Sequence, residues 1–98
     1  MDDPRLLHLS PKDNVCAATA ALSTGDDVTF GDVTFSVTSD VLVGHKIAVR
    51  AIAKGDKVIK YGASIGSATQ PISAGDLVHT HNLASDYLPS AGRVTEGA

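Results

Sequence analysis

The chain has 98 residues, 43% of them hydrophobic, and its 11 acidic residues outnumber its 8 Lys and Arg residues, which gives a formal net charge of −3. This length predicts one domain, and an acidic balance without any run of basic residues argues against a nucleic-acid or membrane-surface partner. The single cysteine, Cys16, excludes an intrachain disulfide. The acidic start of the chain and the absence of a long apolar run lead us to expect a cytoplasmic protein.

The first structural signal along the chain is ambiguous and covers residues 15–22. Residues 15–17 could open a β-strand, whereas Asp13 or Asn14 could cap a short helix over residues 16–21. Of these alternatives, we favour a short strand followed by about one helical turn.

A β-hairpin is predicted next. Residues 28–30 and 33–35 alternate apolar and polar side chains on either side of Gly31 and Asp32. A two-residue loop that begins with glycine favours a type II′ turn, because glycine accepts a positive φ at that position. The later predicted strands cover residues 41–43, 46–52, 58–61, 65–69 and 78–83.

A Gly-Asp-x-Val pattern recurs three times, beginning at Gly25, Gly55 and Gly75. Glycine supplies a positive φ and aspartate hydrogen-bonds to nearby backbone, so each copy predicts a tight turn that ends one strand and starts the next. Val, Ile and Ala dominate the hydrophobic residues and Trp is missing. Together these features predict a mostly β fold with short strands, hairpins and at most one short helix.

The strongest candidate for a binding site is the run His79-Thr80-His81-Asn82. Side chains two positions apart share one face of a strand, so we expect both imidazoles to point the same way. Two imidazoles on one face can bind a divalent metal or a carboxylate. The alternative is a pair of exposed or hydrogen-bonded surface histidines, because two ligands do not complete a metal site.

Two further segments offer groups for an anionic ligand. In one of them, Gly44 allows close approach of the backbone and is followed at once by His45 and Lys46. In the other, Lys60 can pair with a carboxylate and Tyr61 can donate a hydrogen bond. The alternative for each segment is a solvated turn without a ligand.

Five segments, read together, resemble one known family. They are residues 8–15 (HLSPKDNV), 44–48 (GHKIA), 54–62 (KGDKVIKYG), 65–69 (IGSAT) and 74–83 (AGDLVHTHNL). In this order they are similar to the SAF domain of the altronate and galactarate dehydratases, which also occurs as the small subunit of sulfolactate sulfo-lyase. The resemblance implies a SAF-type β-clip fold for residues 1–83, with residues 84–98 as a flexible C-terminal tail or linker.

The resemblance also implies a function. Full-length members eliminate water from a sugar acid to give a 2-keto-3-deoxy acid, with a divalent metal that is often iron(II). The large catalytic domain of the family is not part of this chain, so we expect a large catalytic subunit as partner and no activity without it. The resemblance implies catalytic roles for His45 and His81, metal binding by His79 and His81, and substrate binding by Lys46, Lys60, Tyr61 and Asn82.

Two other functions fit the same residues. One is a non-catalytic SAF module for binding or oligomerisation, in which the histidines are structural. The other is the small subunit of a sulfolactate sulfo-lyase. A β-rich chain with short strands can also pair along an exposed edge, so a homo-oligomer is a further expectation.

Overall fold

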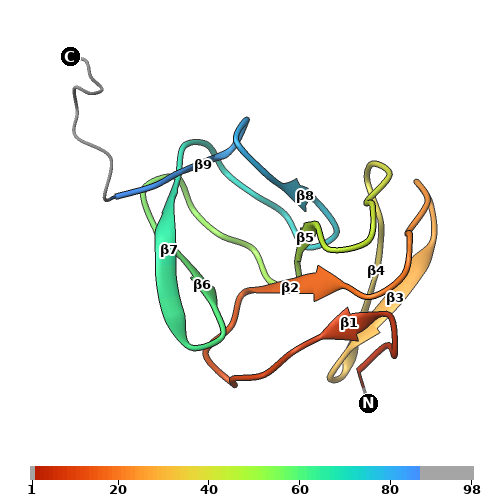
Figure 1. The fold of residues 1–98 in the computed structure, drawn as a ribbon. Helices are drawn as coiled ribbons and strands as arrows, with labels where there is room; N and C mark the ends of the chain where they lie inside the picture. The colour runs from red at the N-terminus through yellow and green to blue at the C-terminus, as the bar shows by residue number, and fades with distance from the viewer. Residues whose placement is uncertain (1, 87–98) are drawn as a thin grey trace.

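The computed structural model describes residues 2–86, which form nine short β-strands (Figure 1). In chain order they are β1 (Leu6–Leu7), β2 (Val15–Ala18), β3 (Asp27–Phe30), β4 (Val33–Ser36), β5 (Lys46–Ala48), β6 (Lys57–Lys60), β7 (Ala63–Ala68), β8 (Leu77–Val78) and β9 (Leu83–Ala84). The prediction of a mostly β fold is confirmed. No helix occurs between residues 2 and 86, and hence none that is long and apolar enough to cross a membrane.

The strands form three small antiparallel sheets. One has the order β1-β2-β5-β8, the second is the β3–β4 hairpin, and the third has the order β6-β7-β9. In Figure 1 the two hairpins lie on opposite sides of the four-stranded sheet. The predicted first hairpin is confirmed: Phe30 pairs with Val33, and of the two loop residues only Gly31 has a positive φ (61°), as a type II′ turn requires.

Four equivalent turns connect these sheets. The three predicted Gly-Asp turns are confirmed, because Gly25, Gly55 and Gly75 have φ angles of 89°, 89° and 96°. A fourth turn of the same form is centred on Gly44, with a φ of 85°, and is followed by His45 instead of Asp. In all four, the glycine N–H donates to a distant carbonyl, and the N–H of the next residue closes the turn onto the carbonyl three residues back.

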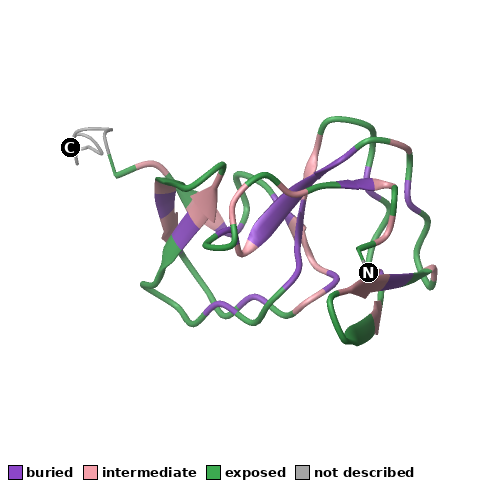
Figure 2. Ribbon diagram, turned by 90° about the horizontal axis from the view of Figure 1, so that it is seen from below, coloured by how far each residue is buried: buried purple, intermediate pink, exposed green. Residues whose placement is uncertain are grey.

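The turns divide the described residues into two similar halves. Leu22 pairs with Val41 around the β3–β4 hairpin, and Ile52 pairs with Ile72 around the β6–β7 hairpin. Each half has its own hydrophobic core. The central strand β2 is buried along its whole length (Figure 2), because Cys16 faces the first core while its neighbour Val15 faces the second.

Some predicted elements were wrong. The predicted helical turn within residues 16–21 does not form, because β2 occupies residues 15–18 and both of its faces are buried. The predicted strand over residues 46–52 ends at Ala48, where the N–H of Val49 turns to the carbonyl of Asn14. The predicted strand over residues 78–83 is interrupted by a turn at residues 79–82. Of residues 41–43, only Val41 forms a bridge, and its partner Leu22 lies outside the named strands.

The described chain continues past the predicted domain boundary at residue 83. Ala84 pairs with Ser67 on β7, and the carboxylate of Asp86 lies 2.7 Å from the ammonium group of Lys57. The remainder of the predicted tail, residues 87–98, lies outside the described residues. The boundary therefore stays a prediction.

Candidate functional site

The fourth turn brings His45 beside His79. Strands β5 and β8 pair antiparallel with Lys46 opposite Val78, and the same register carried one residue further sets His45 opposite His79. The two imidazole rings stack with their centroids 5.4 Å apart and their planes 20° from parallel. Side chains that face each other across two strands are close enough to interact in this way.

His45 occupies the position that aspartate holds in the other three turns. At two of them, the carboxylates of Asp26 and Asp76 accept hydrogen bonds from the backbone N–H groups of Ser23 and Ser73, at 2.9 and 2.8 Å. These bonds close the turn locally. At His45 an imidazole replaces the carboxylate and packs against the ring of His79.

The turn at residues 79–82 is held by Asn82. Its side chain is 2% exposed, its Oδ1 accepts the N–H of His79 at 2.9 Å, and its Nδ2 donates to the carbonyl of Leu77 at 2.8 Å. A side chain that mimics a backbone partner favours a turn over a continuous strand, which explains why the predicted strand is interrupted. The argument that a strand points His79 and His81 the same way is therefore wrong.

A groove of about 470 Å³ opens beside His79. Lys46 lines it from β5 and is half-buried. Burial lowers the pKa of Lys46, and the nearby charge of Lys60 lowers it further. A bound anion would offset both effects, so the groove suits a carboxylate or another anion. The remaining lining residues are Ile65, Thr80, Leu83, Ala84 and Ser85.

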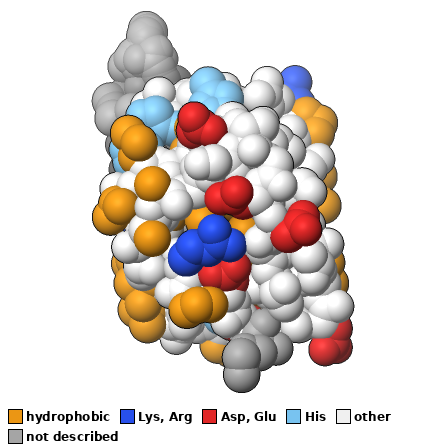
Figure 3. All heavy atoms as spheres, turned by 90° about the vertical axis from the view of Figure 1, so that its right-hand side faces the viewer, with side chains coloured by type: hydrophobic (Ala, Val, Ile, Leu, Met, Phe, Trp, Pro, Cys, Tyr) orange, Lys and Arg blue, Asp and Glu red, His pale blue; other side chains and the backbone are white. Residues whose placement is uncertain are grey.

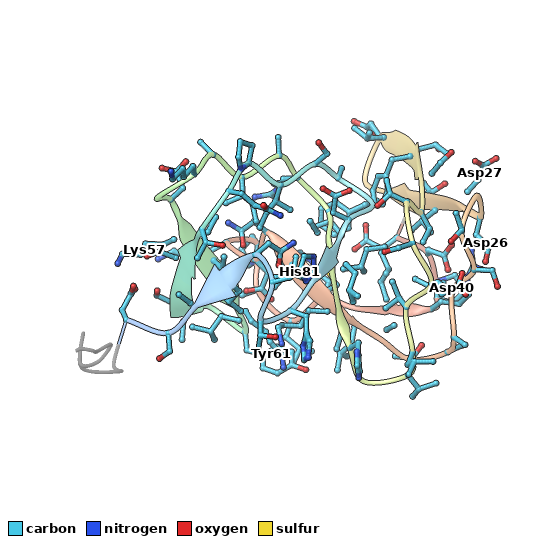
Figure 4. The ribbon with its side chains drawn as sticks, turned by 90° about the horizontal axis from the view of Figure 1, so that it is seen from above. Asp26, Asp27, Asp40, Lys57, Tyr61 and His81 are labelled. Carbon is cyan, nitrogen blue, oxygen red and sulfur yellow. The ribbon has the colours of Figure 1, made fainter. Side chains whose placement is uncertain are left out.

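The other predicted site residues lie at turns around this region. Lys60 ends β6, and its ammonium group lies 4.7 Å from the ring centroid of Tyr61, whose side chain is 44% exposed. His81 is exposed in the same turn as His79. Figure 4 shows Tyr61 and His81 near the middle of the molecule, away from the end that carries Asp26 and Asp40. The individual roles of these residues stay predictions.

The imidazoles fit part of a divalent metal site. His45 and His79 are brought together by the β5–β8 register, whereas the predicted pair was His79 and His81. No group of three or more His, Cys, Asp or Glu side chains suited to a metal exists within residues 2–86. A metal held here would therefore need further ligands from another polypeptide or from the substrate.

The pairing of His45 with His79 was not predicted from the sequence. The sequence pattern put the two residues in separate candidate sites, and only the family resemblance assigned both of them to one active site. A signal was present: residues 41–47 have the same turn pattern as the three Gly-Asp turns, with His45 in the place of Asp. Among the four turns, this is the one in which the residue after the glycine is not aspartate.

These features define a small β-domain with one groove suited to an anion. The sequence profile of the altronate/galactarate dehydratase SAF domain matches residues 4–86, and the chain belongs to this family. It is 49% identical over 74 residues to the altronate dehydratase of Escherichia coli strain K12, and the matched residues cover 76% of this chain and 15% of that protein. It is 37% identical over 80 residues to the altronate dehydratase of Bacillus subtilis strain 168, covering 82% of this chain and 16% of that protein.

The chain is also similar to a protein named as a subunit. It is 43% identical over 49 residues to the (2R)-sulfolactate sulfo-lyase subunit alpha of Chromohalobacter salexigens, covering 50% of this chain and 52% of that subunit. The chain thus spans less than a fifth of the altronate dehydratases that it matches, and about half of this subunit. The recognised family is confirmed.

Proposed function

We propose that this chain is the SAF domain or small subunit of a sugar-acid dehydratase of the altronate/galactarate type. In this role it binds a carboxylate of the substrate and completes an active site whose larger part belongs to a catalytic subunit. The observation that carries the proposal is the stack of His45 on His79 beside the half-buried Lys46.

The electrostatics of the groove support an acidic substrate. Lys46 and Lys60 lie close enough for one charge to lower the pKa of the other, and a carboxylate between them restores a favourable pairing. Eliminating water beside a carboxylate builds negative charge in the transition state. Fixed cations in a partly dry groove stabilise that charge.

The proposed roles follow from the chemistry of each side chain. His45 and His81 are suited to transfer protons to and from the substrate, and Lys46, Lys60 and Tyr61 to hold its carboxylate. Asn82 contributes by fixing the turn of residues 79–82, which carries His79 and His81. A divalent metal such as iron(II) would be held by His79 with His45 or His81, and when bound it supplies Lewis acidity.

A large catalytic subunit is the proposed partner. The turn that carries His45 exposes Leu42 and Val43, each at 62%. The other three turns carry small or polar residues at these two places. In Figure 3, hydrophobic side chains lie beside the histidines at the upper left of this face, and others lie along its remaining edges. Large apolar side chains beside an incomplete site support a surface that a partner covers.

A sulfolactate sulfo-lyase subunit is the second candidate. The likeness to two subunits of that name supports it, since the second, from Paracoccus pantotrophus, is 41% identical over 51 residues that cover 76% of it. Sulfolactate is an anion that the same lysines would attract. The two candidates differ in the substrate and share the site.

Reconstitution tests the proposal. The purified chain is mixed with the large subunit encoded nearest to it and iron(II), and formation of 2-keto acid is followed with altronate, galactarate and sulfolactate. We expect turnover that needs both chains and that falls sharply in His45→Ala and in His81→Ala. The control is Asp40→Asn, which removes an exposed carboxylate from the far end of the molecule.

The outcomes separate the three functions. Turnover of a sugar acid supports the dehydratase, and turnover of sulfolactate alone supports the sulfo-lyase. Full turnover by the large subunit alone, unchanged when this chain is added, would contradict both and leave a non-catalytic binding or oligomerisation module.

A further inference from the structure

The turn between β6 and β7 contains a residue that does not favour its conformation. Lys60 pairs with Ala63 across a loop of two residues, Tyr61 and Gly62, whose φ angles are 55° and 79°. Two successive positive φ angles define a type I′ turn, in which Asn, Asp or Gly is preferred at the first position. Tyr61 is the one non-glycine residue with a positive φ between residues 2 and 86, so its backbone is strained.

The fold itself does not require this strain. The corresponding hairpin of the first half is closed by Gly31 and Asp32, and there only the glycine has a positive φ. A strained backbone persists where its surroundings enforce it, and such positions cluster at functional sites. The contacts around Tyr61 must therefore hold its backbone in this conformation.

The carboxylate of Asp13 holds this turn by accepting a hydrogen bond from its backbone. Its side chain is buried, with 0% exposure, and its Oδ1 accepts the N–H of Gly62 at 2.7 Å. Burial raises the pKa of Asp13, but hydrogen bonds from the backbone of Gly62, Tyr61 and Ser10 lower it, and the net direction is downward. The carboxylate is thus charged at neutral pH and aimed at the backbone of the strained residues.

Asn14 fixes β6, the strand that leads into the turn. The Nδ2 of Asn14 donates to the carbonyl of Lys57 at 3.0 Å, and its Oδ1 accepts the N–H of Ile59 at 2.7 Å. One alternative for the sequence was that Asp13 or Asn14 caps a short local helix. The structure shows that they instead bind β6 and its turn, which lie more than forty positions further along the chain.

The strained turn carries Lys60 and Tyr61, the two residues proposed to hold the substrate carboxylate together with Lys46, although neither lines the groove itself. The ammonium group of Lys60 lies over the ring of Tyr61, and the charge of Lys60 reaches Lys46 in the groove, where it lowers the pKa. Moving the backbone of Tyr61 out of the left-handed region would swing its ring away and release Lys60.

We propose that Asp13 is a positioning residue: its buried carboxylate holds Tyr61 and Gly62 in the left-handed conformation and so fixes Lys60 and Tyr61 for the carboxylate of the substrate. The inference rests on the proposed anion-binding function of the groove. The conformation of the turn can nevertheless be tested without that function.

The first test is spectroscopic and uses the purified chain. In solution NMR, the ε-protons of Lys60 are expected to resonate upfield because they lie near the face of the Tyr61 ring. Asp13→Asn keeps the size of the side chain and one acceptor oxygen but removes the charge and adds an NH2 donor, so it should move these resonances toward the position seen in Tyr61→Asn, which has no ring. Asp40→Asn is the matched control, because that carboxylate also accepts a backbone N–H, from Thr24 at 2.8 Å, but belongs to a different turn.

The second test measures binding of galactarate by titration. Asp13→Asn should weaken binding by at least roughly threefold, and Asp40→Asn should leave it unchanged. In a Tyr61→Asn background the turn favours its own conformation, so adding Asp13→Asn should cause no further loss. A purely structural Asp13 would give the same loss in both backgrounds.

The failures are distinguishable. An unchanged Lys60 resonance in Asp13→Asn, or equal losses in both backgrounds, would overturn the role of Asp13 while leaving the proposed function intact. If the unaltered chain does not bind galactarate, the anion-binding proposal fails, and the Lys60 resonance alone decides the role of Asp13. Should Asp13→Asn not fold, Asp13→Glu keeps the charge but displaces the turn, and it should shift the same resonance.

Discussion

Replacing Gly75 by alanine is expected to destabilise the chain more than the same change at Gly55. Both glycines have left-handed φ angles, 96° and 89°, and sit in equivalent turns. An alanine in this conformation costs about 1–2 kcal/mol at either position. A Cβ at Gly55 would meet nothing within 4 Å, whereas at Gly75 it would lie 2.2 Å from the carbonyl oxygen of Ser36.

The additional cost at Gly75 arises because the obstructing atom belongs to the backbone. Relieving the overlap requires the turn to move away from the end of β4, which adds roughly 1–3 kcal/mol, as in an overpacked core. In a domain of this size 1 kcal/mol changes Tm by about 4–8 °C. We therefore expect Gly55→Ala to lower Tm by roughly 4–16 °C and Gly75→Ala by about twice as much.

Thermal and urea unfolding, followed by circular dichroism, measure both variants against the unaltered chain. Gly25→Ala is a second control, since a Cβ there also meets nothing within 4 Å. Equal midpoints for Gly55→Ala and Gly75→Ala would refute the close approach of the Gly75 turn to Ser36. The packing of the second half against the first hairpin would then be wrong.

Four further predictions concern the site and its surroundings. His45→Asp introduces the aspartate of the other turns, so it should change the free energy of unfolding by less than about 1 kcal/mol while abolishing reconstituted turnover, as melting and activity assays would show. Lys46→Met removes a half-buried charge and its repulsion by a second lysine, so urea unfolding should show equal or higher stability and calorimetry weaker galactarate binding. Leu42→Ser combined with Val43→Ser should leave Tm unchanged and weaken association with the large subunit in sedimentation experiments, because both side chains are 62% exposed. The pKa of Asp13 is lower in the folded chain than its ordinary value of 3.8. The charged carboxylate therefore stabilises the fold fully above pH 3.8, and this stabilisation is lost as the pH falls through the folded pKa. In Asp13→Asn, the free energy of unfolding should fall less steeply as the pH is lowered.

Local features of the sequence were predicted well. Gly31 and the glycines of the three Gly-Asp turns have the conformations that residue type favours, because a positive φ depends on the residue itself. The first hairpin followed from the alternation on both sides of Gly31. Of the residues that line the groove, Lys46 and His79 were also singled out, because of their side-chain chemistry.

Features that depend on distant partners were not predictable. Asp13 and Asn14 have the residue types of helix caps, and only the position of β6 shows that they bind it instead. Asn82 could equally lie on a strand, and its side-chain bonds to the backbone of Leu77 and His79 decide for a turn. Short strands of two or three residues carry too few side chains for a period to be read.

The similarity of the two halves explains where the site lies and why it is incomplete. Strands β5 and β8 are the corresponding strands of the two halves, and they pair with each other. Residues that flank this pair therefore meet across the junction of the halves, as His45 and His79 do. Their counterparts in the repeat, Asp76 and Ala48, serve a turn and a core instead. Imidazoles therefore lie at only one end of the β5–β8 pair. At this end the described fold brings together His45 and His79, with Lys46 and Lys60 nearby. Under the proposed dehydratase function, the remaining groups of the site would come from a partner that covers the exposed side chains of Leu42 and Val43, in the turn that carries His45.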